Sequence, residues 1–315
     1  MTDKRIVVYG GANLDIAAVS KAPILPEDSN PSQIFFAPGG VGRNIAENLA
    51  RLSVPTSLVT AVGSDDFSDH LLAQCTQAGI DCSYAYRSTT GKGCYYLSIH
   101  NPEGEMALAA SDMEAIEDMP LEHAAAAMDH FAGADIVVLD ANLTEARIAQ
   151  IVEGSNCPLL ADPVSATKAS RLRPFLGKLH TLKANFMELS AMVGEELHDL
   201  EDVARVCIQL MEENLQHIFV TMGSGGAYYC ARDGSGLVES PPLEVRNVTG
   251  AGDSFVAGLA YALLQGEDTR SMALTGTAMA RITLQSPYSV NRQVNEETLA
   301  AEKALLDTPP EANPS

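Results

Sequence analysis

Short apolar runs rich in β-branched residues recur along this chain and alternate with segments whose apolar residues follow a helical period. This alternation predicts an α/β fold in which helices cover a mainly parallel sheet. The predicted strands are residues 6–9, 57–62, 136–139, 159–161, 181–182 and 218–221. The predicted helices are residues 44–52, 66–78, 121–131, 145–153, 202–213 and 253–264, with Gly266 as the candidate C-cap of the last.

Two regions interrupt the alternation, residues 15–38 and residues 84–111. In the second region, residues 94–100 and 105–110 flank the turn-forming sequence Asn-Pro-Glu-Gly, which is typical of a β-hairpin. We predict a small β-sheet that projects from a single domain spanning residues 1–307, either as a lid over a site or as an ordinary surface hairpin. Residues 308–315 contain no core-forming residue and are expected to form a disordered tail.

Composition narrows the class of protein. No apolar run approaches the length of a membrane span, and no export signal is visible at the amino terminus. The six cysteines are scattered without a C-x-x-C pair, which favours reduced thiols and a cytoplasmic location. A formal net charge of −21 opposes binding to nucleic-acid phosphates. We therefore expect neither a nucleic acid nor a membrane as a partner.

One short segment of the chain combines glycines with a carboxylate directly before a predicted helix. Residues 248–255 read Val-Thr-Gly-Ala-Gly-Asp-Ser-Phe and lead into an apolar helical stretch. Gly250, Ala251 and Gly252 have little or no side chain, so their backbone N–H groups can approach an anion at the helix N-terminus. Asp253 beside them could accept the proton of a hydroxyl group that attacks a phosphate. A glycine turn with Asp253 as the helix N-cap explains the same residues equally well.

Two earlier segments place polar side chains beside glycines. Asn13 and Asp15 follow the first predicted strand, at the edge of an α/β sheet where ligands bind, and an amide beside a carboxylate suits a diol. An Asx turn is the structural alternative. Gly39 and Gly40 would let the backbone approach a ligand, and Asn44 would open the next helix. Helix capping alone also explains that segment.

Two later segments fit a nucleotide and its metal. Asn185 and Glu188 would share one helix face and could hold hydrated Mg²⁺, although a solvated helix start fits equally well. Thr221, Gly223 and Gly226 belong to a glycine turn that could pass close to a nucleotide or simply bend a hairpin. The glycine segments match neither the dinucleotide-binding fingerprint nor the lysine-containing phosphate loop, which argues against a nicotinamide dehydrogenase.

The order of these segments, with residues 39–63 and 248–255 as signature stretches, resembles the ribokinase-like (PfkB-type) family of carbohydrate and nucleoside kinases over essentially the whole chain. Residues 28–31, 38–46 and 162–166 most closely resemble the pseudouridine kinases of that family. The resemblance implies a central, mainly parallel sheet between helices, with a small β-sheet lid through which such kinases often form homodimers. It also implies transfer of phosphate from ATP, with Mg²⁺, to the 5′-hydroxyl of pseudouridine.

The resemblance assigns roles to matching residues. Asp253 becomes the general base on the ribose 5′-hydroxyl, beside an anion hole formed by Gly250, Ala251 and Gly252. The sugar-binding residues would be Asn13, Asp15, Gly39, Gly40, Asn44 and Asn142, the last standing where ribokinases carry a glutamate. The ATP-binding residues would be Asn185, Thr221, Gly223 and Gly226, and Mg²⁺ would be positioned through water by Asn185 and Glu188.

Two positions leave questions open. Asn247 stands six residues before Asp253, where ribokinases commonly place an aspartate that binds a monovalent cation, so a requirement for such a cation is undecided. Arg43 would either approach an anionic group or remain a solvated first-turn arginine. At the level of function, the alternatives are a kinase for another nucleoside or pentose, and a non-catalytic ligand sensor on a kinase fold.

Overall fold

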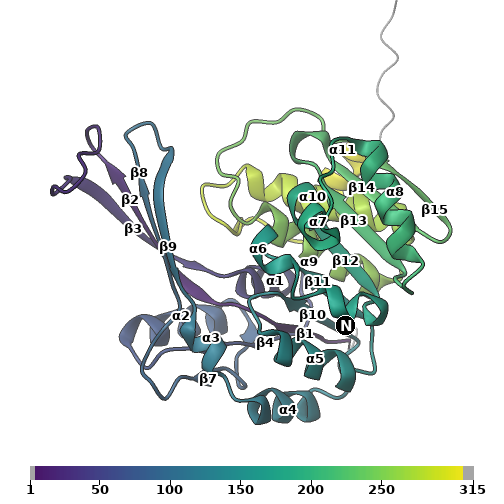
Figure 1. Cartoon of the computed structure of the whole chain (residues 1–315), viewed down its shortest axis with the longest axis horizontal. Coiled ribbons are helices and arrows are strands. Elements are labelled where there is room, and N and C mark those ends of the chain that lie inside the picture. The colour runs from purple at the N-terminus through teal and green to yellow at the C-terminus, as the bar shows by residue number, and fades with distance from the viewer. Residues whose placement is uncertain (1–3, 308–315) are drawn as a thin grey trace, which may run out of the picture.

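The computed structural model describes residues 4–307, so the predicted tail at residues 308–315 lies outside the described residues. The largest sheet contains β1 (Ile6–Tyr9), β4 (Thr56–Val59), β6 (Ile80–Asp81), β10 (Ile136–Asp140), β11 (Leu159–Asp162), β12 (Thr181–Asn185), β13 (His217–Thr221), β14 (Ala227–Ala231) and β15 (Gly234–Val238). Its nine strands are ordered β15-β14-β13-β12-β11-β10-β1-β4-β6 (Figure 1). The strands from β13 to β6 pair in parallel, and β14 and β15 add an antiparallel edge. The predicted mainly parallel sheet is confirmed.

Helices cover both faces of this sheet, because successive residues of a strand point to opposite sides. In β1, Val7 and Tyr9 join one apolar cluster, and Ile6 and Val8 join the other. The Val7 side is covered by α3 (Glu114–Asp118), α4 (Leu121–His130), α5 (Glu145–Gly154), α6 (Ala166–Ala169), the 3₁₀ helix η1 (Arg173–Lys178), α7 (Phe186–Val193) and α8 (Leu200–Met211). The Ile6 side is covered by α1 (Val41–Arg51), α2 (Asp66–Gln77), α9 (Ala251–Gln265), α10 (Thr269–Leu284) and α11 (Glu296–Asp307).

The predicted strand at residues 57–62 is divided in two. β4 ends at Val59, and β5 (Ala61–Val62) leaves the large sheet to pair with β7 (Tyr86–Arg87) in a separate two-stranded sheet. Residues 86–87 therefore do not belong to the small sheet that was predicted from residues 84–111. Gly266 is confirmed as the C-cap of α9, with a left-handed φ of 75° that glycine adopts without strain.

The small sheet has the strand order β3 (Ser32–Gly39), β2 (Asn13–Ser20), β8 (Tyr95–His100) and β9 (Met106–Asp112), and it projects from the body (Figure 1). Residues that pair directly across strands share a face. The face that includes Ile16 is apolar, whereas the opposite face carries Asp15 near the body. The members of the apolar face are Ile16, Ala18, Ile34, Phe36, Leu97, Ile99, Leu108 and Ala110.

Two expectations from composition can be compared with the structure. All six cysteines are free thiols. Within residues 4–307, no helix combines the length and the apolar character that a membrane crossing requires.

Candidate active site

The residues of the predicted anion site lie at the first turn of α9, called the anion turn below. Gly250 is its N-cap, with a left-handed φ of 82°, and a Cβ there would lie 2.0 Å from the carbonyl oxygen of Ser289. Only glycine fits this position. The N–H of Ala251 donates to the carbonyl oxygen of Val248 at a long 3.4 Å. The N–H groups of Gly252 and Asp253 follow in the first turn, where an α-helix offers no intrahelical acceptor, and the dipole of this 15-residue helix favours negative charge there. The turn is therefore suited to bind a phosphate group.

Asp253 and Asn44 meet at this turn, although 209 residues separate them in the sequence. Asn44 Nδ2 donates a hydrogen bond of 2.7 Å to Asp253 Oδ2. The N-caps of the two helices are Gly250 and Gly40, so the helix-capping explanations for Asp253 and Asn44 are both wrong. Neither side chain caps a helix, and the two side chains bond to each other instead.

The environment of Asp253 raises the pKa of its carboxyl group to about 7. Burial is the main cause, and the nearby Asp162 carboxylate acts in the same direction. The hydrogen bond from Asn44 and the charge of Lys183 act in the opposite direction. The Asp253 residue nevertheless remains partly exposed. A reachable carboxylate with a pKa near neutrality is matched to the task of a general base.

The sequence analysis missed Lys183 and Asp162, two buried charged residues beneath the turn. Lys183 on β12 is 4% exposed, and its Nζ donates to Asp162 Oδ2 at 2.9 Å and lies 3.9 Å from Glu188 Oε2. A Cβ on Gly252 would lie 3.1 Å from this ammonium group. Burial opposes the charge, but the Asp162 and Glu188 carboxylates hold the pKa of Lys183 above its usual range. A permanent positive charge therefore lies against the anion turn.

Asp140 at the end of β10 is a further buried carboxylate that the sequence analysis missed. It accepts hydrogen bonds of 2.8 Å from the backbone N–H groups of Gly11 and Asn142, and burial raises its pKa to about 6. Asp140, Asp162 and Lys183 each lie at or near the carboxyl end of an apolar strand. A charged residue near the carboxyl end of a predicted strand is a signal that could have revealed these three residues, because the carboxyl ends of parallel strands meet at one edge of the sheet.

The predicted sugar-binding residues gather at the base of the small sheet. Asn13 and Asp15 lie on β2 and not in an Asx turn, and Asn13 Nδ2 donates to Asp15 Oδ1 at 2.6 Å. A Cβ on Gly39 would lie 2.3 Å from the Asp15 carboxylate, and one on Gly40 would lie 2.4 Å from the carbonyl oxygen of Gly11. Glycine is thus required at both positions for the strands and α1 to approach so closely.

Asn142 belongs to the same group of residues. A Cβ on Gly11 would lie 2.7 Å from Asn142 Nδ2, which places the amide against the loop that precedes Asn13. Lys168 Nζ donates to Asn142 Oδ1 at 2.6 Å. The sequence analysis did not single out Lys168, which adds a partly buried positive charge to this region.

Arg43 is buried, so the alternative of a solvated first-turn arginine is wrong. The anionic group that it approaches is the side chain of Glu47 on the same helix. Its Nη1 also donates to Asn44 Oδ1 at 2.7 Å and to the carbonyl oxygen of Pro38 at 2.8 Å. Arg43 therefore contacts Asn44, which in turn contacts Asp253.

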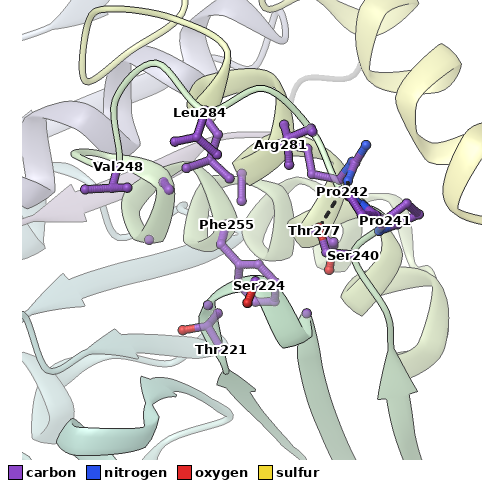
Figure 2. A pocket seen from close by; sticks show the side chains of 17 residues that line it. Thr221, Ser224, Ser240, Pro241, Pro242, Val248, Phe255, Thr277, Arg281 and Leu284 are labelled. Atoms are coloured by element: carbon purple, nitrogen blue, oxygen red, sulfur yellow. Dashed lines mark hydrogen bonds between the residues drawn. The ribbon is translucent and has the colours of Figure 1, made fainter.

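A cavity of about 620 Å³ opens beside the anion turn (Figure 2). Ala251 and Gly252 form part of its wall, and Thr221, Gly223 and Gly226 contribute the bend between β13 and β14. The glycine turn thus bends a hairpin and also lines the cavity. Such a cavity beside an anion site can accommodate a nucleotide base next to its phosphates. The apolar wall consists of Pro241, Pro242, Leu243, Val245, Val248, Phe255, Ala280 and Leu284.

Comparison with known proteins identifies the family. Residues 3–295 match the sequence profile described as pfkB family carbohydrate kinase. The chain belongs to the pfkB family of carbohydrate kinases. It is 35% identical to the pseudouridine kinase of Escherichia coli (strain K12), over 91% of this chain and 92% of that enzyme. It is also 25% identical to a guanosine-inosine kinase of Exiguobacterium acetylicum, over 90% of this chain and 95% of that enzyme.

The fold of this pfkB kinase is ribokinase-like, as the sequence resemblance implied. Ribokinase from Thermotoga maritima superposes with a TM-score of 0.81, over 94% of this chain and 98% of that chain, at 20% identity. Family membership makes the protein a phosphotransferase that acts on an alcohol group. Its substrates are a small sugar or nucleoside and ATP.

Asn185 and Glu188 are not among the residues that line the cavity of the pfkB kinase. They form a capping box at the start of α7, in which each side chain accepts a hydrogen bond of 2.8 Å from the backbone N–H of the other. Glu188 is 3% exposed, so this helix start is not solvated. Among residues 4–307, no group of three or more His, Cys, Asp or Glu side chains could hold a metal ion.

Asn247 is fully engaged within the pfkB kinase. Its Oδ1 accepts a hydrogen bond of 2.9 Å from the N–H of Thr249, and its Nδ2 donates to the carbonyl oxygen of Pro287 at 3.2 Å. The amide is neutral where ribokinases commonly carry a carboxylate, so this position offers a monovalent cation no negative charge.

Proposed function

We propose that this pfkB kinase transfers the γ-phosphoryl group of ATP to the 5′-hydroxyl group of pseudouridine. The observation that carries the proposal is the hydrogen bond between Asn44 and Asp253. This hydrogen bond joins a predicted sugar-binding residue to the proposed general base beside the anion turn. The 35% identity with a pseudouridine kinase supports this choice of acceptor. The similarity to a guanosine-inosine kinase makes another nucleoside the second candidate.

The proposed reaction is a direct in-line transfer that needs no covalent enzyme intermediate. The nucleotide base would occupy the apolar cavity, and the γ-phosphate would lie against the N–H groups around Gly252, above the ammonium group of Lys183. Asn13 and Asp15 would bind the ribose hydroxyls. Asp253 accepts the proton of the 5′-hydroxyl group as its oxygen bonds to phosphorus and ADP leaves.

Asn185 and Glu188 are the residues that we propose to position Mg²⁺ through water. Amide and carboxylate oxygens are hard ligands of the kind that Mg²⁺ prefers, and the engagement of both side chains in the capping box excludes a tight all-protein site. When bound with ATP, Mg²⁺ supplies positive charge that neutralises the phosphate oxygens. Potassium activation is not part of the proposal, because Asn247 carries no charge.

The test is ATP consumption by the purified protein with Mg²⁺ and a panel of pseudouridine, uridine, guanosine, inosine, ribose and fructose, with the mass of each product determined. We expect a clear preference for pseudouridine and formation of its 5′-monophosphate. A preference for another acceptor would contradict the proposed substrate but keep the proposed mechanism. No turnover with any acceptor would favour a non-catalytic sensor.

Activity should depend on the ionisation of Asp253. We expect kcat/KM to rise as the pH increases through about 7, since only the ionised carboxylate accepts a proton and kcat/KM reports the free enzyme. Asp162→Asn removes a negative charge that raises the pKa of Asp253, so this acid limb should move to lower pH. The nucleotide ionises identically in both assays, so a displacement would come from a group of the protein on which Asp162 acts, as it does on Asp253. The same acid limb in both proteins would contradict the assignment.

We also propose that the small sheet acts as a lid and that two copies of the chain pair through its apolar face. Ile34, Phe36 and Leu108 on this face are 58%, 59% and 63% exposed. Contiguous exposed apolar side chains of this kind mark interaction surfaces. A second copy is the occupant that we propose, because the resemblance to ribokinase-like kinases implies pairing through the lid.

Leu108→Lys should convert the dimer to a monomer, because a charge at the centre of an apolar interface would be buried without a partner. Ala109→Lys is the matched control, since Ala109 is the next residue on β9 and points to the opposite face. Multi-angle light scattering measures the mass of each protein. A monomeric wild-type protein, or a dimeric Leu108→Lys variant, would exclude this interface.

A further inference from the structure

We infer that Arg43 is a positioning residue for the general base: it orients the amide of Asn44 so that the amide N–H group faces the Asp253 carboxylate. The inference rests on the proposed function, in which Asp253 accepts the substrate proton. Arg43 acts through Asn44, and we assign it no contact with substrate.

Arg43 is held from several directions. It is 3% exposed, and a buried guanidinium group requires hydrogen-bond and charge partners. Nη1 donates to the carbonyl oxygen of Pro38 and to Asn44 Oδ1, and Nη2 donates to the Glu47 carboxylate. The backbone N–H of Arg43 donates to the carbonyl oxygen of Gly11 at 3.0 Å, which holds the start of α1 against the loop after β1. These contacts fix the direction in which the guanidinium group meets Asn44.

The hydrogen bonds of Asn44 determine the orientation of its amide. An asparagine amide has one acceptor oxygen and one donor nitrogen. Because Arg43 donates to Oδ1 at 2.7 Å and Ser289 Oγ does so at 3.4 Å, Nδ2 is the atom that faces Asp253. If the amide turned over, Oδ1 would face the Asp253 carboxylate, and this arrangement is favourable only when the carboxyl group is protonated. Arg43 therefore favours the ionised carboxylate that a base requires.

Charged groups on several packed elements also act on this arrangement. Asp162 on β11 and Asp140 on β10 raise the pKa of Asp253, whereas Lys183 on β12 lowers it. All three groups remain in place when Arg43 is replaced. The charged or titratable groups near Arg43 itself are Glu47 and Arg51 on α1, Asp15 on β2 and Cys75 on α2.

Arg51 provides a matched control on the same helix. Its Nε and Nη2 donate to Glu47 Oε1 at 3.0 and 2.6 Å, so Glu47 keeps one arginine partner when either Arg43 or Arg51 is replaced. Arg51 directs its hydrogen bonds to Glu47 and to the carbonyl oxygen of Arg292, so we expect its replacement to leave the orientation of the Asn44 amide unchanged. Arg43→Met and Arg51→Met each remove an arginine that bonds to the Glu47 carboxylate. Only Arg43→Met also removes the contact to Asn44.

The experiment follows the carboxyl ¹³C resonance of Asp253 against pH, in full-length protein labelled at aspartate, with the signal assigned by its loss in Asp253→Asn. We expect Arg43→Met to move the titration of Asp253 upward by about one pH unit, and Arg51→Met to leave it unchanged. The acid limb of kcat/KM should move by the same amount, with activity recovering at high pH. Asn44→Ala should raise the titration similarly, and combining it with Arg43→Met should add little.

An unchanged titration of Asp253 in Arg43→Met would overturn the inference even if turnover fell, because a purely structural role would lower activity equally at all pH values. If that variant does not fold, Arg43→Lys replaces it: a lysine cannot reproduce the planar fork of donors, so a smaller upward movement is expected and none would overturn the inference. The resonance needs no substrate. If the Asp253 titration moves upward in Arg43→Met as expected but the protein has no kinase activity, the positioning role stands and the proposed function is rejected.

Discussion

Replacing Asp253 with Asn is expected to lower turnover at least about a hundredfold while leaving ATP binding nearly unchanged. The amide has the shape of the carboxylate and can still accept the hydrogen bond from Asn44, but it cannot take a proton from the acceptor hydroxyl group. A positioned general base typically contributes about 10²- to 10⁴-fold. Asp253 does not line the cavity proposed for the nucleotide. The measurements are kcat with saturating substrates and the Kd for ATP by calorimetry.

Asp66→Asn is the control for this variant. Asp66 also lies in the first turn of a helix, but it is exposed on α2 and should be replaceable without loss of turnover. Normal turnover in Asp253→Asn would show that another group is the base. A parallel loss of turnover and ATP binding would indicate that the substitution distorts the anion turn, and not that a proton acceptor was removed.

Replacing Lys183 with Met should reduce the free energy of unfolding by about 3–5 kcal/mol at neutral pH, because it leaves the buried Asp162 carboxylate without its cation. Turnover should also fall, since the positive charge beside the anion turn is lost. Urea denaturation followed by circular dichroism measures the stability, and the linear extrapolation gives the free energy.

The matched control is Lys178→Met, because Lys178 forms an exposed ion pair with Glu153 at 3.6 Å. Its replacement should change the stability by less than about 1 kcal/mol. Adding Asp162→Asn to Lys183→Met should restore part of the lost stability, since the unpaired charge is then absent. A loss below about 1 kcal/mol in Lys183→Met would show that water or a neighbouring group compensates for the missing ammonium group.

The helix starts show where local reasoning failed. The sequence places Asn44 and Asp253 between a glycine-containing segment and an apolar helical stretch, which is where an N-cap is expected. In the structure Gly40 and Gly250 take the N-cap positions with positive φ angles of 97° and 82°. The two helices therefore begin earlier than predicted, and both side chains turn inward. The close approach that requires these glycines comes from distant segments, so no local pattern could show it.

Helix α10 illustrates a second limit. It is almost entirely buried, and its sequence mixes small and polar residues such as Thr275 and Thr277 with apolar ones. Such a helix lacks the polar face by which an amphipathic surface helix is identified. Its position between α9 and α11 buries these side chains, and the sequence alone does not indicate that position.

The sequence by itself determined the layered α/β fold, because alternating apolar periods of strands and helices are local properties of the chain. It also indicated the glycine turn at residues 250–252 and the Asp253 carboxyl group beside it, because both are local features of the chain. Only the tertiary structure decided which polar side chains act together. Asn44 meets Asp253, and Arg43 orients Asn44. Lys183 is buried beneath Gly252 together with Asp162. Hydrogen bonds and ion pairs between distant segments depend on distances that arise only when the strand ends meet at one edge of the sheet.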